Sequence, residues 1–524
     1  MTEIPRDRTP LLSNTPPQRA LRALLLVLAG ALQTLSFSPW EFWLAGPVSI
    51  IAILLLCLSR PPGELFRSGW LVGLGLFGSG VSWVYVSIHD YGVPSAPVAG
   101  TMTLLFVMGL ALIPGALFWC WGRLAGDDRW RRLCLFPALW LLGDWVRGWI
   151  LTGFPWLYLG TAQVDGPLAG WAPLLGVHGL TLIIVASACA LVAALERALA
   201  GQRVLSALVL GAALLPWLAG PLLGQIQWTQ PGGEPIRYAV MQGNIPQQIK
   251  WDPDHLRAQL NTYMDMSEQD WDRDLLLWPE TAIPMPHVQA REVLEHLDDR
   301  GRETGATLMT GIPWYGNTPG RADRGFHNSI MTLGADQGVY HKQKLVPFGE
   351  YVPLENWLKG TLDFFSLPLS SFRPGPRDQT PLGVAGALVH PFICYEIAYG
   401  DFVARNSAHT GFLLTISNDA WFGDSLGPKQ HMQIARMRAL ETGRPLLRGT
   451  NNGITAQVDR KGQIVKQIPR FQQGVLRGEF QPAYGDTPYM ATGSWPALIT
   501  AIILIVFTRR PNKKKPWGPT RTHH

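Results

Sequence analysis

One of the five cysteines in this chain stands apart from the others. Cys394 ends an apolar run at residues 389–393 and is the only cysteine after residue 190. The other four lie in or beside long hydrophobic segments: Cys57, Cys120, Cys134 and Cys189. A thiol in such a segment behaves as a small buried apolar group. A thiol directly after a predicted strand and before Tyr395 and Glu396 is typical of a nucleophile, and the alternative is an inert buried cysteine.

A thiol nucleophile needs a base that generates the thiolate and a donor that holds the oxyanion of a tetrahedral intermediate. None of the five histidines in residues 327–431 has a recognisable partner spacing for the base. Glu280 is a better candidate, because it follows a strand stopped by Pro279, at the edge where α/β folds place their chemistry. Its alternative role is to cap a loop. Lys342 and Lys344 precede a proline–glycine turn, where lysines are usually solvated.

The composition indicates a membrane protein. Hydrophobic residues make up 47% of the 524 residues and charged residues only 16%, which is too apolar for a wholly soluble chain. A helix that crosses a bilayer needs about 20 mostly apolar residues. Eight segments meet this description: residues 21–38, 41–59, 69–87, 97–121, 133–148, 169–195, 204–224 and 489–507. Asp144 and Arg147 interrupt the fifth, where such charges pair or face a protein-lined cavity, and their role stays open.

The basic residues predict the orientation of these spans. Positively charged short loops stay cytoplasmic. Arginine and lysine gather before the first span, in every second loop and after the eighth span: Arg19 and Arg22, Arg60 and Arg67, Arg129 to Arg132, Arg197 and Arg203, and Lys513 to Lys515. Both termini are therefore predicted in the cytoplasm, with residues between the seventh and eighth spans outside. The basic tail accounts for the formal net charge of +6 without a nucleic-acid partner.

The predicted outside segment has a different pattern from the spans. Short β-like stretches at residues 236–241, 275–278, 307–311, 329–333, 386–393 and 413–417 alternate with helical patterns at 254–267, 289–304 and 429–442. The chain thus divides into a cytoplasmic start (1–20), seven helices (21–230), one α/β domain (231–486), an eighth helix (487–508) and a basic tail (509–524). An unpaired thiol in an exported domain is best explained by a chemical role.

Three segments of this domain together resemble the nitrilase superfamily, whose signature residues occur in the order Glu, Lys, Cys. They are residues 278–280, 342–351 and 393–396. Further segments are similar to one membrane branch of that superfamily, the apolipoprotein N-acyltransferases: residues 345–353, 417–423, 427–431 and 450–453. The eight predicted spans agree with this branch, and the resemblance covers nearly the whole chain.

The resemblance implies an α-helical membrane domain of eight transmembrane helices joined to an α/β nitrilase-like α-β-β-α sandwich. It implies Glu280 as general base, Lys342 as oxyanion stabiliser and Cys394 as nucleophile. Lys342 is preferred to Lys344 because the family lysine stands eight residues before the glutamate of the Pro-Phe-Gly-Glu motif, which is Glu350 here.

Glu350 and three other residues match further positions of the family. Tyr395 and Glu396 either contact substrate or only orient the cysteine loop. Trp251 resembles a tryptophan at the mouth of the site, and its alternative role is to cap a hydrophobic edge.

The implied reaction is a two-step acyl transfer in the bacterial inner membrane, with the catalytic domain in the periplasm. A phospholipid, phosphatidylethanolamine, donates an acyl group to Cys394, and the α-amino group of a diacylglyceryl-modified apolipoprotein accepts it. We expect a monomer. We expect no metal or nucleotide cofactor, because neither a metal-binding pattern nor a phosphate-cradling glycine loop occurs in the sequence.

Two other functions are compatible with the same residues. A membrane-tethered amidase would use Glu280, Lys342 and Cys394 but resolve the thioester with water. A transporter or receptor whose α/β domain binds a ligand without chemistry would tolerate replacement of each of the three.

Overall fold

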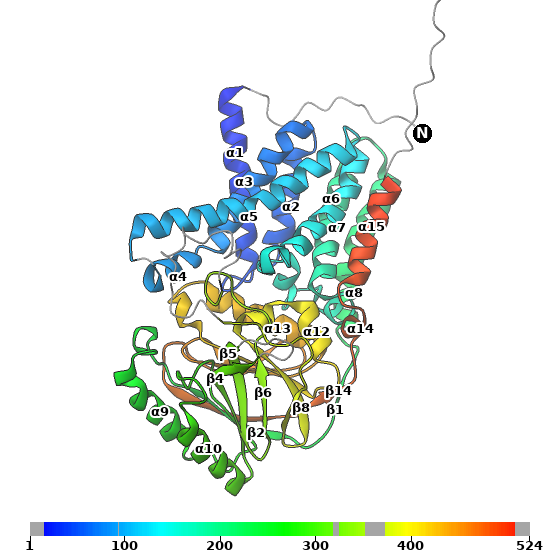
Figure 1. Ribbon diagram of the computed structural model, residues 1–524. Coiled ribbons are helices and arrows are strands. Elements are labelled where there is room, and N and C mark those ends of the chain that lie inside the picture. Colours follow the sequence, from blue (N-terminus) through cyan, green and yellow to red (C-terminus); the bar gives the residue numbers. More distant parts are fainter. Residues whose placement is uncertain (1–14, 93, 318–323, 352–371, 509–524) are drawn as a thin grey trace, which may run out of the picture.

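The molecule has two parts, one built of helices and the other of strands with helices packed on them (Figure 1). The computed structural model describes residues 15–92, 94–317, 324–351 and 372–508, so the predicted basic tail and most of the predicted cytoplasmic start lie outside the described residues. One part, here called the helical layer, consists of α1–α8 and α15. The other, the sandwich domain, covers residues 230–484 and holds all the strands that the structure describes.

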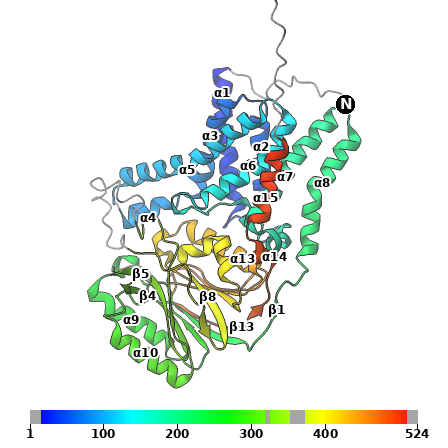
Figure 2. The same ribbon diagram turned by 45° about the vertical axis from the view of Figure 1, so that its right-hand side comes forward.

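The helical layer is built from apolar helices of unequal length. Their bounds are α1 Pro16–Leu32, α2 Ala45–Cys57, α3 Pro62–Gly80, α4 Val84–Tyr91, α5 Ala96–Ala125, α6 Arg129–Arg147, α7 Ala172–Leu199, α8 Arg203–Leu223 and α15 Trp495–Thr508. The helix α8, at the edge of the helical layer in Figure 2, packs against α7 and leaves many leucines exposed. Leu208 and Leu218 on this helix are 66% and 70% exposed, and leucines exposed in a row are typical of a helix in contact with lipid.

Within the described residues, four helices are long and apolar enough to cross a membrane: α1, α5, α7 and α8. The predicted span at residues 69–87 is two helices, because Val81 leaves the helical conformation and α3 and α4 then meet at a bend of 57°. Together this pair forms a fifth candidate. The helices α2 and α15 are apolar but have only 13 and 14 residues. The count of eight spans stays a prediction.

The sandwich domain contains two six-stranded sheets. The first has the order β13-β2-β3-β4-β5-β6 and the second the order β12-β11-β10-β9-β8-β7. The strands of the first sheet are β2 Ile236–Gln242, β3 Leu275–Leu277, β4 Thr307–Asn317, β5 Arg324–Gly334, β6 Gly338–His341 and β13 Gly474–Phe480. Those of the second are β7 Leu382–Val384, β8 Ala387–Ile393, β9 Phe412–Ser417, β10 Leu446–Thr450, β11 Thr455–Val458 and β12 Ile464–Ile468.

Side chains alternate along these strands and define four layers. In β2, Val240 packs between the two sheets, whereas Ala239 and Met241 pack toward α9 (Pro253–Ser267) and α10 (Arg291–Thr304). In β9, Leu414 packs between the sheets, whereas Leu413 packs toward α12 (Gly400–Asn406) and α13 (Gly427–Thr442). The resulting α-β-β-α order confirms the predicted sandwich. All six strands and three helices predicted for this domain are present.

One pair of helices in the sandwich domain faces the helical layer. It consists of α12 (Gly400–Asn406) and α13 (Gly427–Thr442), which lie between the strands and the apolar helices (Figure 1). Because β8, β9 and β10 run parallel, their carboxyl ends meet at one edge of the sheet. The residues that follow β8 and β9 pack against the helical layer, since Tyr395 and Phe422 share a hydrophobic cluster with Trp83 and Trp156.

Candidate active site

The structure brings Glu280, Lys342 and Cys394 together from three different strand ends. Glu280 lies in the turn after β3, Lys342 directly follows β6, and Cys394 directly follows β8. The Lys342 Nζ atom lies 3.6 Å from Glu280 Oε1. The charges of Lys342 and Glu280 both act on the Cys394 thiol. All three predicted residues therefore share one site.

Two carboxylates hold the Lys342 ammonium. Its Nζ donates to Glu350 at 2.9 Å in addition to the contact with Glu280, and the lysine is only 1% exposed. Burial opposes the charged form of Lys342, but Glu350 and Glu280 outweigh it and raise the pKa of the ammonium above its ordinary value. Lys342 is therefore a fixed cation, suited to binding an oxyanion and unsuited to acting as a base. By contrast, Lys344 lies over the Tyr399 ring, with Nζ 5.4 Å from the ring centroid.

Two asparagines orient Glu280. Asn328 Nδ2 donates to Glu280 Oε1 at 2.7 Å and to Glu350 Oε1 at 2.9 Å, and so ties the two carboxylates together. The backbone N–H of Asn418 donates to Glu280 Oε2 at 2.8 Å. Asn328, which lies in the middle of β5, was not predicted, and Asn418 was predicted only as part of a family motif. Because Asn328 stands between His327 and Ser329, the polarity of its own strand did not distinguish it.

Cys394 has a left-handed backbone conformation. Its φ is +51°, and a residue with a side chain adopts this conformation only at a cost in free energy. Contacts with the surrounding residues must therefore stabilise it. The thiol is partly buried. Burial is the largest cause that raises the pKa of the thiol, the Glu280 carboxylate adds to it, and Lys342 opposes it. The resting side chain is therefore a neutral thiol, which needs a base close by to become a nucleophile.

Glu396 fixes the loop that carries the cysteine. Its buried carboxylate accepts backbone N–H groups of Ile393 at 2.8 Å and Gln343 at 2.6 Å, and the Tyr340 hydroxyl at 3.0 Å. Because Gln343 adjoins Lys342, the same carboxylate ties the cysteine loop to the lysine loop. Burial raises the pKa of Glu396 to about 7, and these backbone donors limit the rise. These contacts favour an orienting role for Glu396, while the choice between its two predicted roles stays a prediction.

Tyr395 and Trp251 occupy the borders of the site. The Tyr395 hydroxyl donates to the carbonyl oxygen of Gly153 in the helical layer at 3.0 Å, and its ring stacks with that of Trp156. Trp251 is 38% exposed. Its neighbour Lys250 is buried and donates from Nζ to the Glu280 carbonyl oxygen at 2.9 Å. Lys250 was not predicted, although it adjoins the predicted tryptophan.

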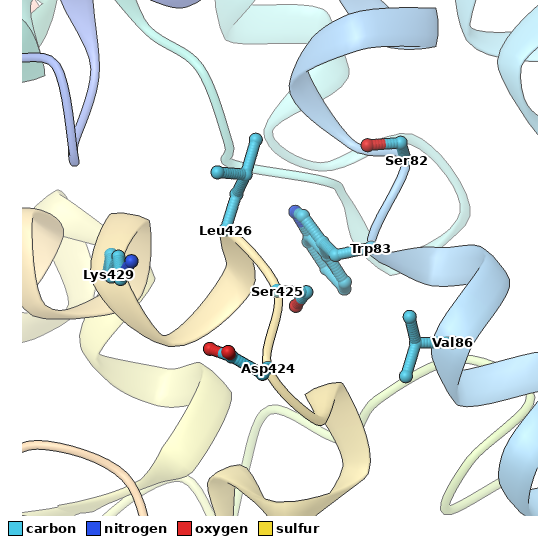
Figure 3. A pocket seen from close by; sticks show the side chains of 7 residues that line it. All are labelled: Ser82, Trp83, Val86, Asp424, Ser425, Leu426 and Lys429. Atoms are coloured by element: carbon cyan, nitrogen blue, oxygen red, sulfur yellow. The ribbon is translucent and has the colours of Figure 1, made fainter. Parts of the chain in front are cut away.

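A cavity of about 330 Å³ opens between the two parts of the molecule. It is lined at the bend between α3 and α4 by Ser82, Trp83 and Val86, and from the sandwich domain by residues 424–426 and Lys429 (Figure 3). Trp83 connects this cavity to the site through Trp156, whose ring centroid lies 5.4 Å away. Across the described ranges, no three His, Cys, Asp or Glu side chains are grouped as they would be at a metal site.

The fold and the site define a carbon–nitrogen hydrolase domain attached to an apolar helical domain. The model of the carbon-nitrogen hydrolase family matches residues 237–489, and that of the apolipoprotein N-acyltransferase N-terminal domain matches residues 29–190. The chain belongs to the apolipoprotein N-acyltransferase family, which confirms the resemblance found in the sequence.

Relatives with this name cover almost the whole chain. The apolipoprotein N-acyltransferase of Pseudomonas syringae pv. tomato is 45% identical over 92% of this chain and 95% of its own length. That of Pseudomonas aeruginosa PAO1 is 44% identical over 94% of this chain and 98% of its own length. Among solved structures, a member of branch 10 of the nitrilase superfamily from Saccharomyces cerevisiae has a TM-score of 0.36 at 16% identity, covering 48% of this chain and 91% of that chain.

Proposed function

We propose that this protein transfers a fatty acyl chain from a phospholipid to an apolipoprotein through a thioester on Cys394. Glu280 takes the thiol proton while the sulfur attacks the ester carbonyl, and Lys342 holds the oxyanion. Collapse of this intermediate releases the lysophospholipid, whose oxygen receives the proton from Glu280. The α-amino group of the diacylglyceryl-modified cysteine then attacks the thioester. Glu280 accepts a proton from the amine and returns it to the sulfur.

One observation supports these roles most strongly. The Lys342 ammonium is buried between the Glu280 and Glu350 carboxylates, and both Lys342 and Glu280 act electrostatically on the Cys394 thiol. A neutral thiol, a fixed carboxylate and a fixed cation are the three parts that thioester formation needs. We propose that Glu350 holds Lys342, Glu396 and Tyr395 hold the cysteine loop, and Trp251 contacts substrate at the mouth of the site.

We further propose that the donor is phosphatidylethanolamine and that it approaches from the helical layer. The cavity at the bend between α3 and α4 supports this route, because Trp83 and Trp156 connect it to Tyr395 beside the nucleophile. Lys429 on its wall is suited to the phosphate of a lipid headgroup. We expect a monomer that needs no cofactor.

We also propose eight membrane spans, cytoplasmic termini and a periplasmic sandwich domain in the bacterial inner membrane. The distribution of arginine and lysine between the apolar segments supports this topology. Labelling of intact cells with a membrane-impermeant maleimide tests it. A cysteine introduced at the exposed Glu234 should react, whereas one introduced at Thr520 should react only after lysis.

The acyl transfer is tested by incubating the purified protein in detergent with phosphatidylethanolamine and no acceptor. We expect a hydroxylamine-labile acyl adduct on the Cys394 peptide in mass spectrometry, absent from Cys394→Ala and retained by the control Cys120→Ala. Addition of a diacylglyceryl peptide should then discharge the adduct onto its amine. Absence of both adduct and lysophospholipid would contradict the proposal, and release of free fatty acid alone would favour a hydrolase.

A further inference from the structure

A cluster of buried polar side chains adjoins Cys394 on the side of β9 and α13. It consists of Ser417, Asp419, His431 and Arg448, and none of the four is more than 1% exposed. They come from the end of β9, the turn after it, α13 and β10. We call these four residues the Arg448 cluster. The proposed mechanism assigns no role to any of them.

The hydrogen bonds within the cluster fix the protonation of its members. Arg448 Nη2 donates to Asp419 Oδ2 at 3.0 Å and to His431 Nδ1 at 3.1 Å. His431 Nδ1 also lies 3.4 Å from Asp419 Oδ1, but Arg448 is closer and an arginine only donates, so Nδ1 is assigned as an acceptor and the proton lies on Nε2. Burial, aided by Arg448, lowers the pKa of the imidazole, which keeps it neutral. Asp419 also accepts the Ser417 hydroxyl at 2.7 Å. Burial favours the neutral form of Asp419, but Arg448 outweighs it and lowers the pKa of the carboxyl, so Asp419 is ionised.

The cluster contacts Cys394 at two atoms. His431 Nε2 donates to the Cys394 carbonyl oxygen at 3.0 Å. The Ser417 side chain lies beside the Cys394 thiol, and its hydroxyl lowers the pKa of that thiol. The sheet register accounts for this second contact, because Ile393 pairs with Ile416 in the parallel β8–β9 ladder and the next residue on each strand is Cys394 or Ser417.

The two contacts have different consequences. The bond to the carbonyl oxygen fixes the peptide group of a residue whose φ is +51°, a conformation that needs such support. The second contact places a hydroxyl beside the sulfur of the proposed nucleophile. A hydroxyl has one proton, which goes to Asp419 in the resting state, and turning it to the sulfur would stabilise a thiolate.

We propose that the Arg448 cluster prepares Cys394 for reaction. His431 is a positioning residue that remains neutral and holds the cysteine backbone. Ser417 is a catalytic residue whose hydroxyl turns from Asp419 to the sulfur when the thiolate forms, while Arg448 keeps the Asp419 carboxylate paired. This inference rests on the proposed function, in which Cys394 is the nucleophile.

The hydroxyl turns twice in each catalytic cycle, and no bond of Ser417 breaks. When Glu280 removes the thiol proton, the Ser417 O–H donates to the thiolate. When the S–C bond of the thioester forms, the sulfur loses its negative charge and the O–H returns to Asp419. Attack by the amine expels the thiolate, which receives the O–H again until Glu280 returns its proton to the sulfur.

Alkylation of Cys394 by iodoacetamide tests the serine without any lipid. A hydrogen bond to an ionised group stabilises it enough to shift a pKa by about one unit or more, so Ser417→Ala should be alkylated roughly tenfold more slowly at pH 8. Ser417→Thr keeps the hydroxyl and should restore most of the rate. The matched control is Thr415→Val on the same strand, whose buried hydroxyl has no hydrogen-bond partner. An unchanged rate in folded Ser417→Ala would overturn the role of Ser417.

Two substitutions test the histidine. His431→Gln keeps an N–H where Nε2 stands and should retain most of the rate of acyl-adduct formation. His431→Leu removes the donor and should lower kcat roughly tenfold or more with little change in KM. Because His431 is neutral throughout, neither variant should change the slope of log rate against pH. Equal losses in both variants, with a changed slope, would make His431 an acid or base and overturn its positioning role.

The two assays separate the inference from the function on which it rests. A wild-type protein that forms no acyl adduct would contradict the proposed acyl transfer, whatever the alkylation rates. A wild-type protein that forms the adduct, together with Ser417→Ala and His431→Leu variants that react at the wild-type rate, would contradict only the inference.

Discussion

Substitution of Gly311 by alanine should displace the proposed general base. Gly311 lies in β4 against the turn that carries Glu280. A Cβ atom at this position would stand 2.4 Å from Thr281 N and 2.7 Å from Glu280 Cα and Pro279 O. All three are backbone atoms, so no side-chain rotation can relieve the contact. An ordinary contact begins at 3.4 Å, and the turn must therefore move by about 1 Å relative to β4.

A displacement of this size is large for a catalytic group. Misplacement of a reacting group by about 1 Å can lower a rate about 100-fold, and overpacking of this kind costs about 1–3 kcal/mol of stability. We expect Gly311→Ala to fold with a lowered Tm and to form the Cys394 acyl adduct about 100-fold more slowly.

The assay is the time course of adduct formation with phosphatidylethanolamine, followed by mass spectrometry beside a thermal melt. The matched control is Gly474→Ala in β13, where the added Cβ would meet the Ile468 side chain at an ordinary 3.5 Å. This control should keep both its rate and its Tm. A Gly311→Ala protein that acylates at the wild-type rate would refute the reasoning, because the position of Glu280 would then not limit the reaction.

Two further predictions concern buried polar groups. Asn328→Leu removes the amide that donates to both Glu280 and Glu350, and should slow adduct formation at least tenfold at a stability cost of about 1–3 kcal/mol, read from the same two assays. Burial raises the pKa of Glu441 to about 7. The folded protein therefore keeps a proton that the unfolded chain releases above pH of about 4.5, so its free energy of unfolding should fall by up to about 3 kcal/mol as the pH rises to 7. Thermal melts at successive pH values should show a smaller fall in stability for Glu441→Gln than for the wild type. The fall that remains in the variant is assigned to Glu396, whose pKa is also raised to about 7. An identical pH dependence in the wild type and the variant would contradict this prediction.

The strands that precede Glu280 and Cys394 could be predicted because their sequences agree with their environments, whereas β6, which precedes Lys342, was not predicted. In β2, β3, β8 and β9 both faces are covered by other layers, so nearly all their residues are apolar and the strands are readily recognised. The motifs around Glu280, Lys342 and Cys394 then identified the residues at the strand ends. The structure places these three residues in one site, while their chemical roles stay predictions.

The rest of the site could not be predicted, because it depends on contacts between distant segments. β10 was missed although it is fully buried, since its central residue is an arginine. Arg448 is buried there only because Asp419 and His431, on other elements, accept its hydrogen bonds. None of the histidines had a recognisable partner spacing, and His431 finds its partners through the fold instead. The bend between α3 and α4 was missed for a similar reason, because the apolar pattern continues through it.

The position of Cys394, the proposed nucleophile, follows from the way the two parts of the molecule are joined. The residues after Cys394 bond to the helical layer, Tyr395 to the Gly153 carbonyl oxygen and Tyr399 to that of Thr152. Gln430 on α13 accepts the indole N–H groups of both Trp83 and Trp156. The cysteine loop is thus held by the apolar helices as well as by its own domain.

This attachment matters for an enzyme whose proposed substrates carry acyl chains. Each methylene buried in a membrane contributes about 0.8 kcal/mol to retention, so withdrawal of ten methylenes into water would cost about 8 kcal/mol. A site held against the helical layer avoids this cost, because the ester can reach the sulfur while most of its chain stays among apolar side chains. A free-standing sandwich domain with the same Glu280, Lys342 and Cys394 would have to overcome that cost at each turnover. The contacts of Tyr395 and Gln430 with the helical layer are therefore part of what makes a phospholipid an accessible donor.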